Sequence, residues 1–479
     1  MITQSSPVIL WLRKDLRIDD NAALAAAVET GAPVLPVYIR EPEHLGTGPL
    51  GAAQSWWLHH SLHELSARFT ALGSPIILRS GPASEVLDAL IAETGAEAVF
   101  WNRRYDPKGI AIDSPLKQSL VARGIAVKSF AGQLMHEPSR LLTGSGTPYR
   151  VYTPFWRAFA GAGDPPSPVK APARIPAAKQ TVESDVLNDW NLTPTKPDWA
   201  STFREVFTPG EMAAQVRLEA FLKNGLDRYD KGRDFPAGHA TSLLSPHLAM
   251  GEISPARIWH ATIGLVDTVG EDNLIRFRKE LVWREFSYHL LFHFPDLATR
   301  NWNDRFDSFA WGENETFFTL WTKGQTGYPI VDAGMRELWR HGTMHNRVRM
   351  IAASFLIKDL LIDWRRGEEW FRDTLLDADP ASNPASWQWV AGSGADASPW
   401  FRIFNPTLQG EKFDPKGDYV RRFVPELAKL DAKYIHRPFE APLAELARAG
   451  ITLGKTYPRP IVDHAQARQQ ALDAYGATG

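Results

Sequence analysis

Acidic, aromatic and basic side chains recur in the C-terminal half of the chain at spacings that would place them on shared helix faces. Glu280, Trp283 and Arg284 stand at positions i, i+3 and i+4, so a helix would present all three on one side. Together, an acid, a flat ring and a cation could hold a nucleobase by stacking and by hydrogen bonds to its edge. Taken alone, the segment could equally form a surface ion pair beside a partly buried tryptophan.

Hydroxyl and basic groups suited to phosphate occur in two further segments. Several hydroxyls precede or begin an expected helix, where free N–H groups favour anions, although such hydroxyls often serve only as helix caps. They belong to Tyr229, Thr241, Ser242 and Ser245. Four arginines and two histidines lie between Arg336 and Arg349, and this patch could contact a DNA backbone or form a solvated basic face.

A fourth segment combines carboxylates with an amide. Asp377 and Asp379 could hold a divalent metal, but the segment offers no third ligand, and we expect no metal site. If buried, the two carboxylates could instead accept hydrogen bonds from a flavin ring, with Arg349 balancing one charge. A polar turn is the alternative. Asn383 and two tryptophans follow on the same segment.

The bulk composition indicates a globular protein of more than one domain. A length of 479 residues is too long for one ordinary core, and the net charge of −2 neither suggests nor excludes a DNA partner. The chain has no cysteine, which excludes disulfides, thiol catalysis and cysteine-bound metal. Its first apolar run, Val8–Leu12, is too short for a signal peptide, and no later stretch approaches a membrane span. We therefore expect a cytoplasmic protein with no membrane partner.

The first 130 residues alternate between strand and helix patterns, which predicts a doubly wound parallel sheet in an α/β domain. The expected strands are Val8–Leu12, Pro33–Ile39, Pro75–Leu78, Ala98–Trp101 and Ile125–Phe130. The expected helices are Asn21–Thr30, Ala52–Leu72, Ser84–Thr94 and Ile110–Arg123. Neither a G-x-G-x-x-G motif after the first strand nor a P-loop is present, which disfavours an ordinary dinucleotide or NTPase site.

Three parts are expected along the chain. Residues 1–133 form the α/β domain, and residues 134–205, rich in proline and without sustained periodicity, form a connector that crosses the surface. Residues 206–479 are helical and aromatic and form an all-α domain. The clearest helix of this domain is expected over Asn346–Trp364, which is apolar on one side.

In order and spacing, the segments above resemble the photolyase/cryptochrome family over essentially the whole chain. The most specific stretches are GYPIVDAGMREL, MHNRVRMIAASFLIKDLLIDW and FRIFNPTLQGEKFDPKGDYVRRFVPEL, and WLRKDLRIDDNAAL is similar to the family's opening strand and turn. The resemblance is greatest to a cyclobutane pyrimidine dimer photolyase with plant-cryptochrome-like features. It implies a U-shaped FAD in the helical domain, UV-damaged DNA as the partner, and light-driven repair by electron transfer.

The resemblance also assigns residues. The cofactor would contact Tyr229, Thr241, Ser242, Ser245, Arg349, Asp377, Asp379 and Asn383. The damaged DNA would contact Trp283, Arg284, Trp389, Met350, Arg347 and Arg402. Glu280 would hydrogen-bond a thymine edge, and electrons would reach resting flavin through a relay formed by Trp387, Trp364 and Trp311. Leu243 stands where many members have arginine, which puts one phosphate contact in doubt.

Two positions of the family pattern favour repair of cyclobutane dimers. Asn383 matches the residue that faces flavin N5, where a neutral amide tolerates the fully reduced, anionic flavin that repair needs. Plant cryptochromes typically carry aspartate there. Enzymes that repair six-four photoproducts use a histidine pair, and Asn346 and Met350 at the matching positions cannot act as acid or base at neutral pH.

The remaining expectations concern the antenna chromophore, the oligomeric state and the alternative functions. The antenna chromophore is expected to be 5,10-methenyltetrahydrofolate, with a deazaflavin as the alternative, and the protein is expected to be a monomer. A cryptochrome photoreceptor that signals through a protein partner is the alternative function. A long C-terminal extension is the signature of such a photoreceptor, whereas the residues after Arg437 show no distinctive pattern. The third hypothesis is a light-independent nucleotide-binding enzyme, and under this hypothesis the purified protein would be colourless.

Overall fold

A parallel five-stranded sheet forms the centre of the N-terminal part of the computed structural model, which describes residues 6–42, 50–396 and 401–478. The strands are β1 Val8–Leu12, β2 Val34–Arg40, β3 Ile77–Ser80, β4 Ala98–Asn102 and β5 Ala126–Phe130. Their spatial order is β3-β2-β1-β4-β5, so the first strand is central and the chain winds outward in both directions. All five strands lie within two residues of the predicted bounds, and the doubly wound α/β prediction is confirmed.

Four helices cover the two faces of this sheet. They are α1 Ala22–Glu29, α2 Ala52–Ala71, α3 Ala83–Thr94 and α4 Pro107–Ala122. Side chains alternate along β1, so Val8, Leu10 and Leu12 share a core with α1 and α2. Ile9 and Trp11 point to the opposite face and share a core with α3 and α4.

The predicted start of the fourth helix is three residues too late. Asp106 accepts a hydrogen bond from the backbone N–H of Gly109 over 2.9 Å, and Pro107 occupies the first helical turn. Aspartate followed by proline is a standard helix start, because the ring fixes a helical φ and lacks an N–H that would need a partner. This signal was present in the sequence.

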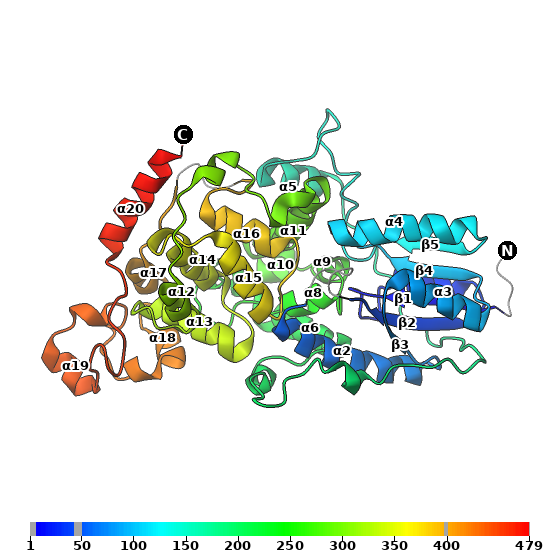
Figure 1. The fold of residues 1–479 in the computed structure, drawn as a ribbon, viewed down its shortest axis with the longest axis horizontal. Helices are drawn as coiled ribbons and strands as arrows, with labels where there is room; N and C mark the ends of the chain where they lie inside the picture. Colours follow the sequence, from blue (N-terminus) through cyan, green and yellow to red (C-terminus); the bar gives the residue numbers. More distant parts are fainter. Residues whose placement is uncertain (1–5, 43–49, 397–400, 479) are drawn as a thin grey trace.

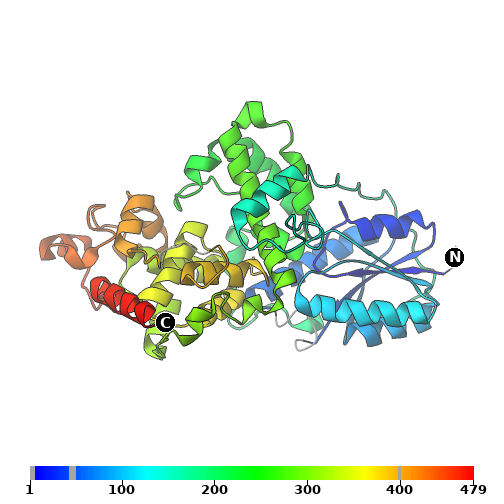
Figure 2. The ribbon, with the colours of Figure 1, turned by 90° about the horizontal axis from the view of Figure 1, so that it is seen from above.

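Among its described residues, the C-terminal part forms helices and adds no strand to the sheet, as predicted. Its α-helices are α6 Glu211–Asn224, α7 Tyr229–Gly232, α8 Ser245–Met250, α9 Pro255–Ala261, α10 Val266–Val269, α11 Glu271–His293, α12 Glu315–Thr322, α13 Pro329–His341, α14 Asn346–Ser354, α15 Trp364–Thr374, α16 Ser382–Ala391, α17 Pro406–Phe413, α18 Asp418–Phe423, α19 Leu443–Ala449 and α20 His464–Ala477. Figures 1 and 2 show this helical part beside the α/β domain, with α20 away from the sheet. None of the described helices is both long and apolar enough to cross a membrane.

The prediction of a single helix over Asn346–Trp364 is wrong. Helix α14 ends at Ser354, a π-helical turn follows over Phe355–Asp359, and α15 begins only at Trp364. The break is stabilised by polar side chains: Lys358 donates to the carbonyl oxygen of Ala391 over 2.6 Å, and Asp359 pairs with His464 of α20 at 2.5 Å. The apolar pattern continues through the break because nearly every residue there is buried, so periodicity could not reveal it.

The connector contains a helix that the sequence analysis did not predict. Helix α5, Tyr152–Gly161, buries Tyr152, Phe155 and Phe159 in the same hydrophobic core as the long helix α11. Figure 1 shows α5 beside α11. Shorter 3-10 turns follow at Leu187–Trp190 and Ser201–Glu205. Because α5 packs on the helical domain, part of the connector contributes to that domain's core.

The two domains meet at close backbone and side-chain contacts. A Cβ at Gly51, just before α2, would lie 2.0 Å from the carbonyl oxygen of Arg372 at the end of α15, so only glycine permits this approach. Deeper in the interface, the indole of Trp57 donates to Glu252 over 2.9 Å, and Glu252 also pairs with His247 at 2.5 Å. These contacts hold α8, which begins at Ser245, against the α/β domain.

Candidate active site

A cavity of about 850 Å³ lies within the helical domain. Its wall is built from α7, the segment 233–245, α8, α11, the start of α14 and the segment from 375 to the end of α16. Of the residues predicted to bind cofactor or DNA, all but Arg402 line this one cavity. Arg402 is exposed and is not one of the residues that line the cavity. A cavity of this size is typical of a small-molecule or cofactor site.

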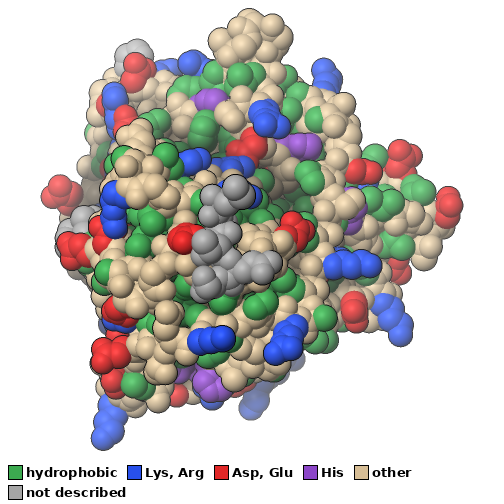
Figure 3. All heavy atoms as spheres, turned by 90° about the vertical axis from the view of Figure 1, so that its right-hand side faces the viewer, with side chains coloured by type: hydrophobic (Ala, Val, Ile, Leu, Met, Phe, Trp, Pro, Cys, Tyr) green, Lys and Arg blue, Asp and Glu red, His purple; other side chains and the backbone are tan. Residues whose placement is uncertain are grey.

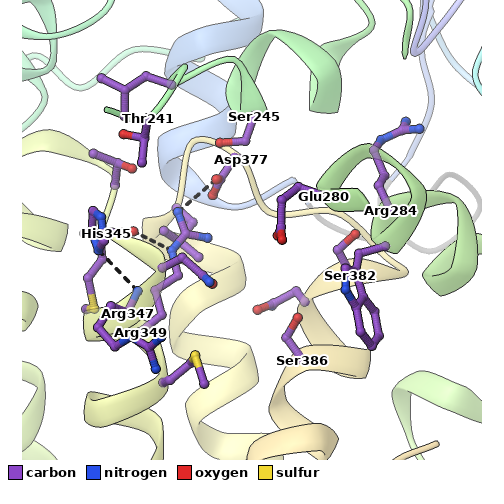
Figure 4. A pocket seen from close by; sticks show the side chains of 18 of the residues that line it. Thr241, Ser245, Glu280, Arg284, His345, Arg347, Arg349, Asp377, Ser382 and Ser386 are labelled. Carbon is purple, nitrogen blue, oxygen red and sulfur yellow. Dashed lines mark hydrogen bonds and ion pairs between the residues drawn. The ribbon is translucent and has the colours of Figure 1, made fainter. Parts of the chain in front are cut away.

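The predicted face of α11 is present, but its three side chains have different interaction partners. Glu280 and Trp283 line the cavity, and Glu280 forms an ion pair with Arg233. Arg284 donates to the carbonyl oxygen of Gln133 over 2.9 Å, and in Figure 4 it points away from the other labelled side chains. Arg284 is therefore engaged with the last residue of the α/β domain, whereas Glu280 faces the open space.

The hydroxyl groups lie along one edge of the cavity. Thr241, Ser242 and Ser245 all line it, and Ser245 is the first residue of α8. Leu243, between them, has a φ of +52°, a left-handed conformation that non-glycine residues rarely adopt. The left-handed turn at Leu243 lies between hydroxyl groups that all line the cavity. Tyr229 is also buried in this wall.

Arg349 and Asp377 form the predicted pair. The guanidinium of Arg349 donates to Asp377 over 2.8 Å and to the carbonyl oxygen of Met344 over 2.7 Å (Figure 4). Within the described part of the chain, the second carboxylate oxygen of Asp377 is buried without a hydrogen-bond partner. Asp379 accepts from the backbone N–H groups of Ala381 and Ser382 over 2.8 and 2.6 Å, which fixes the start of α16.

The amide of Asn383 has a defined orientation. Its nitrogen donates to the carboxylate of Glu368 over 2.9 Å and to the backbone oxygen of Glu368 over 3.1 Å. Burial raises the pKa of Glu368, while Arg372 and the Asn383 amide oppose that shift. Glu368 lies one helical turn after Trp364, and no sequence pattern singled it out.

The cavity wall near α14 holds the remaining predicted substrate residues. Asn346, Met350 and Trp389 line it. Arg347 pairs with Asp234 at 2.8 Å, and its guanidinium lies 4.3 Å from the ring centre of Phe413, so this cation is already held by the protein.

Two further titratable groups of this wall, His345 and Glu337, lie in the predicted basic patch but were given no separate role. Burial lowers the pKa of His345 to about 4, so its ring is neutral at pH 7, and its Nδ1 accepts from the N–H of Arg347. Burial raises the pKa of Glu337 to about 7 despite hydrogen bonds from Tyr419 and the backbone of His345. At neutral pH the His345 ring is therefore uncharged, and Glu337 is divided between its protonated and ionised forms.

The three relay tryptophans share one hydrophobic cluster, and only the last one of the expected route is more than slightly exposed. Trp387 lines the cavity and packs on the backbone of α15, where a Cβ at Gly367 would lie 2.2 Å from its ring. Trp364 is fully buried, and its indole donates to Asn301 over 2.9 Å. Trp311 is only partly buried and precedes Gly312, which pairs with Ile362 near the start of α15.

A second series of aromatic rings also leads away from Trp387. Trp387 lies 6.4 Å from Trp321, and Phe371 bridges the two at 4.9 and 6.1 Å. From Trp321 the series continues through Phe318 to Trp370, at 5.9 and 6.5 Å, and ends at Trp339, stacked at 6.3 Å on Trp370 and 54% exposed. Contacts between residues so distant in sequence have no local sequence signal.

These features fit FAD. The unpartnered oxygen of Asp377 can accept from a ring N–H, and because the Asn383 nitrogen is bound to Glu368, the amide has its oxygen to offer to a ligand. The hydroxyls of Thr241, Ser242 and Ser245 supply neutral ligands for a diphosphate beside a helix start. Among the described residues, no cluster of three acidic or histidine side chains could hold a metal ion.

Comparison with known proteins agrees with this site. The family model of the FAD binding domain of DNA photolyase matches residues 277–477, and that of DNA photolyase matches residues 8–173. The chain is 64% identical over 477 residues to the deoxyribodipyrimidine photo-lyase of Agrobacterium fabrum, covering 100% of this chain and 99% of that protein. It is 38% identical to cryptochrome-1 of Arabidopsis thaliana, covering 96% of this chain and 69% of that protein.

A solved structure gives the same result. The crystal structure of a bacterial class III photolyase from Agrobacterium tumefaciens superposes with a TM-score of 0.97 at 63% identity, covering 100% of this chain and 98% of that one. The sequence motifs, the cavity and both kinds of comparison lead to one assignment. The chain belongs to the photolyase/cryptochrome family.

Proposed function

We propose that the chain is a deoxyribodipyrimidine photo-lyase, which uses light and bound FAD to split cyclobutane pyrimidine dimers in DNA. The observation that carries the proposal is the continuity of the cavity. Asp377 and Asn383, which suit a flavin, and Glu280, Trp283 and Trp389, which suit a flipped-out pyrimidine pair, line the same space. The 64% identity to a deoxyribodipyrimidine photo-lyase supports the same activity.

Each side chain would have a simple task in this reaction. Reduced FAD, when bound, supplies the photoexcited electron that opens the cyclobutane ring and is then returned. Trp283 and Trp389 stack on the extruded pyrimidines, and Glu280, held by Arg233, accepts a hydrogen bond from a thymine edge. Asn346 and Met350 donate no proton, and a ring opened by an electron that is then returned needs none.

The direct test is light-dependent loss of thymine dimers from a damaged oligonucleotide. The holoenzyme with chemically reduced flavin should restore intact thymines under blue light and leave them damaged in the dark. Trp283→Ala should bind damaged DNA more weakly by about 1–3 kcal/mol per lost stack, with FAD retained. A holoenzyme that shows no repair under blue light would leave the photoreceptor as the better assignment.

A cryptochrome photoreceptor is the second candidate, because the chain is 38% identical to cryptochrome-1 of Arabidopsis thaliana. Asn383 argues against it: the amide beside Glu368 suits reduced flavin, whereas an aspartate there would favour proton uptake by the flavin. The repair assay separates the two candidates, since a photoreceptor that has lost repair would change its absorption under blue light without removing dimers.

Three finer assignments remain part of the proposal. We propose 5,10-methenyltetrahydrofolate as the antenna, with a deazaflavin as the alternative, on the basis of the plant-type SLLSPHL motif. We also propose a cytoplasmic monomer. The absorption spectrum of purified protein before and after denaturation identifies both chromophores, and light scattering measures the molecular mass in solution.

A further inference from the structure

Trp283 stacks against a tyrosine from the connector. The ring centres of Trp283 and Tyr152 lie 3.6 Å apart with only 4° between their planes. Tyr152 is the first residue of α5, far from Trp283 in sequence, and it is 7% exposed. Trp283 lines the cavity and Tyr152 does not. One face of the indole is therefore covered by the protein, and the other is available to a ligand.

The stack is held by its surroundings. Two isolated rings prefer an offset or edge-to-face arrangement with centres about 4.5–7 Å apart, so a close parallel pair needs outside support. The hydroxyl of Tyr152 donates to the carbonyl oxygen of Lys279, one turn before Trp283 on α11, over 2.8 Å. Phe286 packs edge-on against both rings, at 5.8 Å from Tyr152 and 5.9 Å from Trp283. These contacts fix the plane and the depth of the pair.

We propose that Tyr152 is a positioning residue for recognition of damaged DNA, and that it makes helix α5 of the connector part of the substrate site. The inference rests on the proposed function. A free tryptophan side chain must lose rotamer freedom before it can stack on a base, which weakens binding. Tyr152 removes that cost in advance by holding the indole plane parallel to the incoming pyrimidine. Undamaged duplex, in which no base is extruded, does not reach this surface.

The test compares the holoenzyme with its Tyr152→Leu and Tyr152→Phe variants. Dissociation constants are measured in the dark for a duplex containing one thymine dimer and for the same duplex undamaged. Tyr152→Leu should weaken binding of the dimer duplex by about two- to tenfold, the range expected for loss of one aromatic pair. Its affinity for undamaged duplex and its FAD content should match the unmodified protein. Tyr152→Phe keeps the ring, loses only the hydrogen bond to Lys279, and should weaken binding less than Tyr152→Leu does.

Phe155→Leu is the matched control. Phe155 is also buried on α5, 2% exposed, but packs on Phe159, Phe286 and His289 rather than on Trp283. It should leave dimer binding unchanged, even if it lowers stability as much as Tyr152→Leu does. In a Trp283→Leu background, Tyr152→Leu should have no further effect, because the plane that Tyr152 holds is gone.

Several outcomes would overturn the inference. They are unchanged dimer affinity in Tyr152→Leu, an equal loss for damaged and undamaged duplex, a loss in Phe155→Leu of the same size, or effects that add to those of Trp283→Leu. Should Tyr152→Leu fail to retain FAD, Tyr152→Met fills the space with a flexible chain and replaces it in every comparison. Failure of the unmodified protein to prefer the dimer duplex would overturn the proposed function itself, which distinguishes the two failures.

Discussion

The amide nitrogen of Asn383 donates to the carboxylate of Glu368 on the neighbouring helix over 2.9 Å, and this fixes which end of the amide faces the cavity. The nitrogen is occupied by Glu368, so the oxygen is the group left for a ligand. An amide oxygen accepts hydrogen bonds and does not donate them. The pair therefore suits a flavin that carries a proton on N5, as the fully reduced form does.

Removing the carboxylate should lower the midpoint potential of bound FAD. In Glu368→Leu the Asn383 amide is free to rotate, and the hydrogen bond that favours the reduced flavin is weakened. One hydrogen bond of about 0.5–1.5 kcal/mol corresponds to roughly 10–30 mV for two electrons. Spectroelectrochemical titration of the holoenzyme measures this shift. Glu368→Gln, whose amide oxygen can still accept from Asn383, should keep the potential of the unmodified protein. If the midpoint potential of bound FAD is the same in Glu368→Leu as in the unmodified protein, Glu368 does not orient the amide.

Glu337 should make stability depend on pH. Burial raises the pKa of its carboxyl from 4.5 to about 7, so folding favours the protonated form. Its stabilising contribution is complete below the unfolded pKa and is lost as the pH rises from 4.5 to about 7. Glu337→Gln keeps an acceptor for Tyr419 without the charge. The free energy of unfolding of the variant, minus that of the unmodified protein, should therefore increase across this range.

Urea unfolding at about pH 5 and about pH 8 measures this difference. Other groups that titrate in the same interval, such as His345, are present in both proteins and cancel in the comparison. A difference that stays constant with pH would mean that Glu337 keeps an ordinary pKa in the folded protein.

Electron supply to resting flavin should survive the loss of one aromatic route. Trp364→Phe interrupts the relay toward Trp311, but the rings from Trp387 through Trp321 to the exposed Trp339 remain in place. Each of Trp364→Phe and Trp321→Phe should slow photoreduction of oxidised FAD, and the double variant should abolish it. Absorbance changes under blue light measure the rate. Chemically reduced double variant should still repair dimers. If Trp364→Phe alone abolishes photoreduction of FAD, the second series of rings carries no electrons.

Local patterns in the sequence were sufficient for the sheet and for most of the cavity. Strands separated by helices predict a parallel sheet, and all but one of the binding residues that the family motifs predicted line the cavity. Features that depend on distant segments were missed. The π-helical turn after Ser354 exists because Lys358 and Asp359 find partners on α16 and α20. Likewise, Tyr152 lies in a proline-rich connector, and only folding brings it onto Trp283.

Asp234 should weaken DNA binding by holding Arg347. The two side chains pair at 2.8 Å beside the cavity, so a phosphate that approaches Arg347 competes with a carboxylate. Asp234→Asn should tighten binding of DNA at low salt and make the logarithm of the binding constant fall more steeply with salt, by up to about 0.9 per phosphate gained. Arg347→Ala should make the logarithm of the binding constant fall less steeply with salt.

Figure 3 shows lysines and arginines interspersed with acids over the described residues of one face, so the removal of any acid could strengthen binding through net charge alone. Glu315→Gln controls for this effect, because Glu315 forms a similar ion pair with Arg366 at 2.7 Å but does not line the cavity. If Asp234→Asn and Glu315→Gln change the salt dependence equally, the effect is one of net charge. A steeper slope in Asp234→Asn alone assigns the new phosphate contact to Arg347, because only there does the lost carboxylate free a cation beside the cavity.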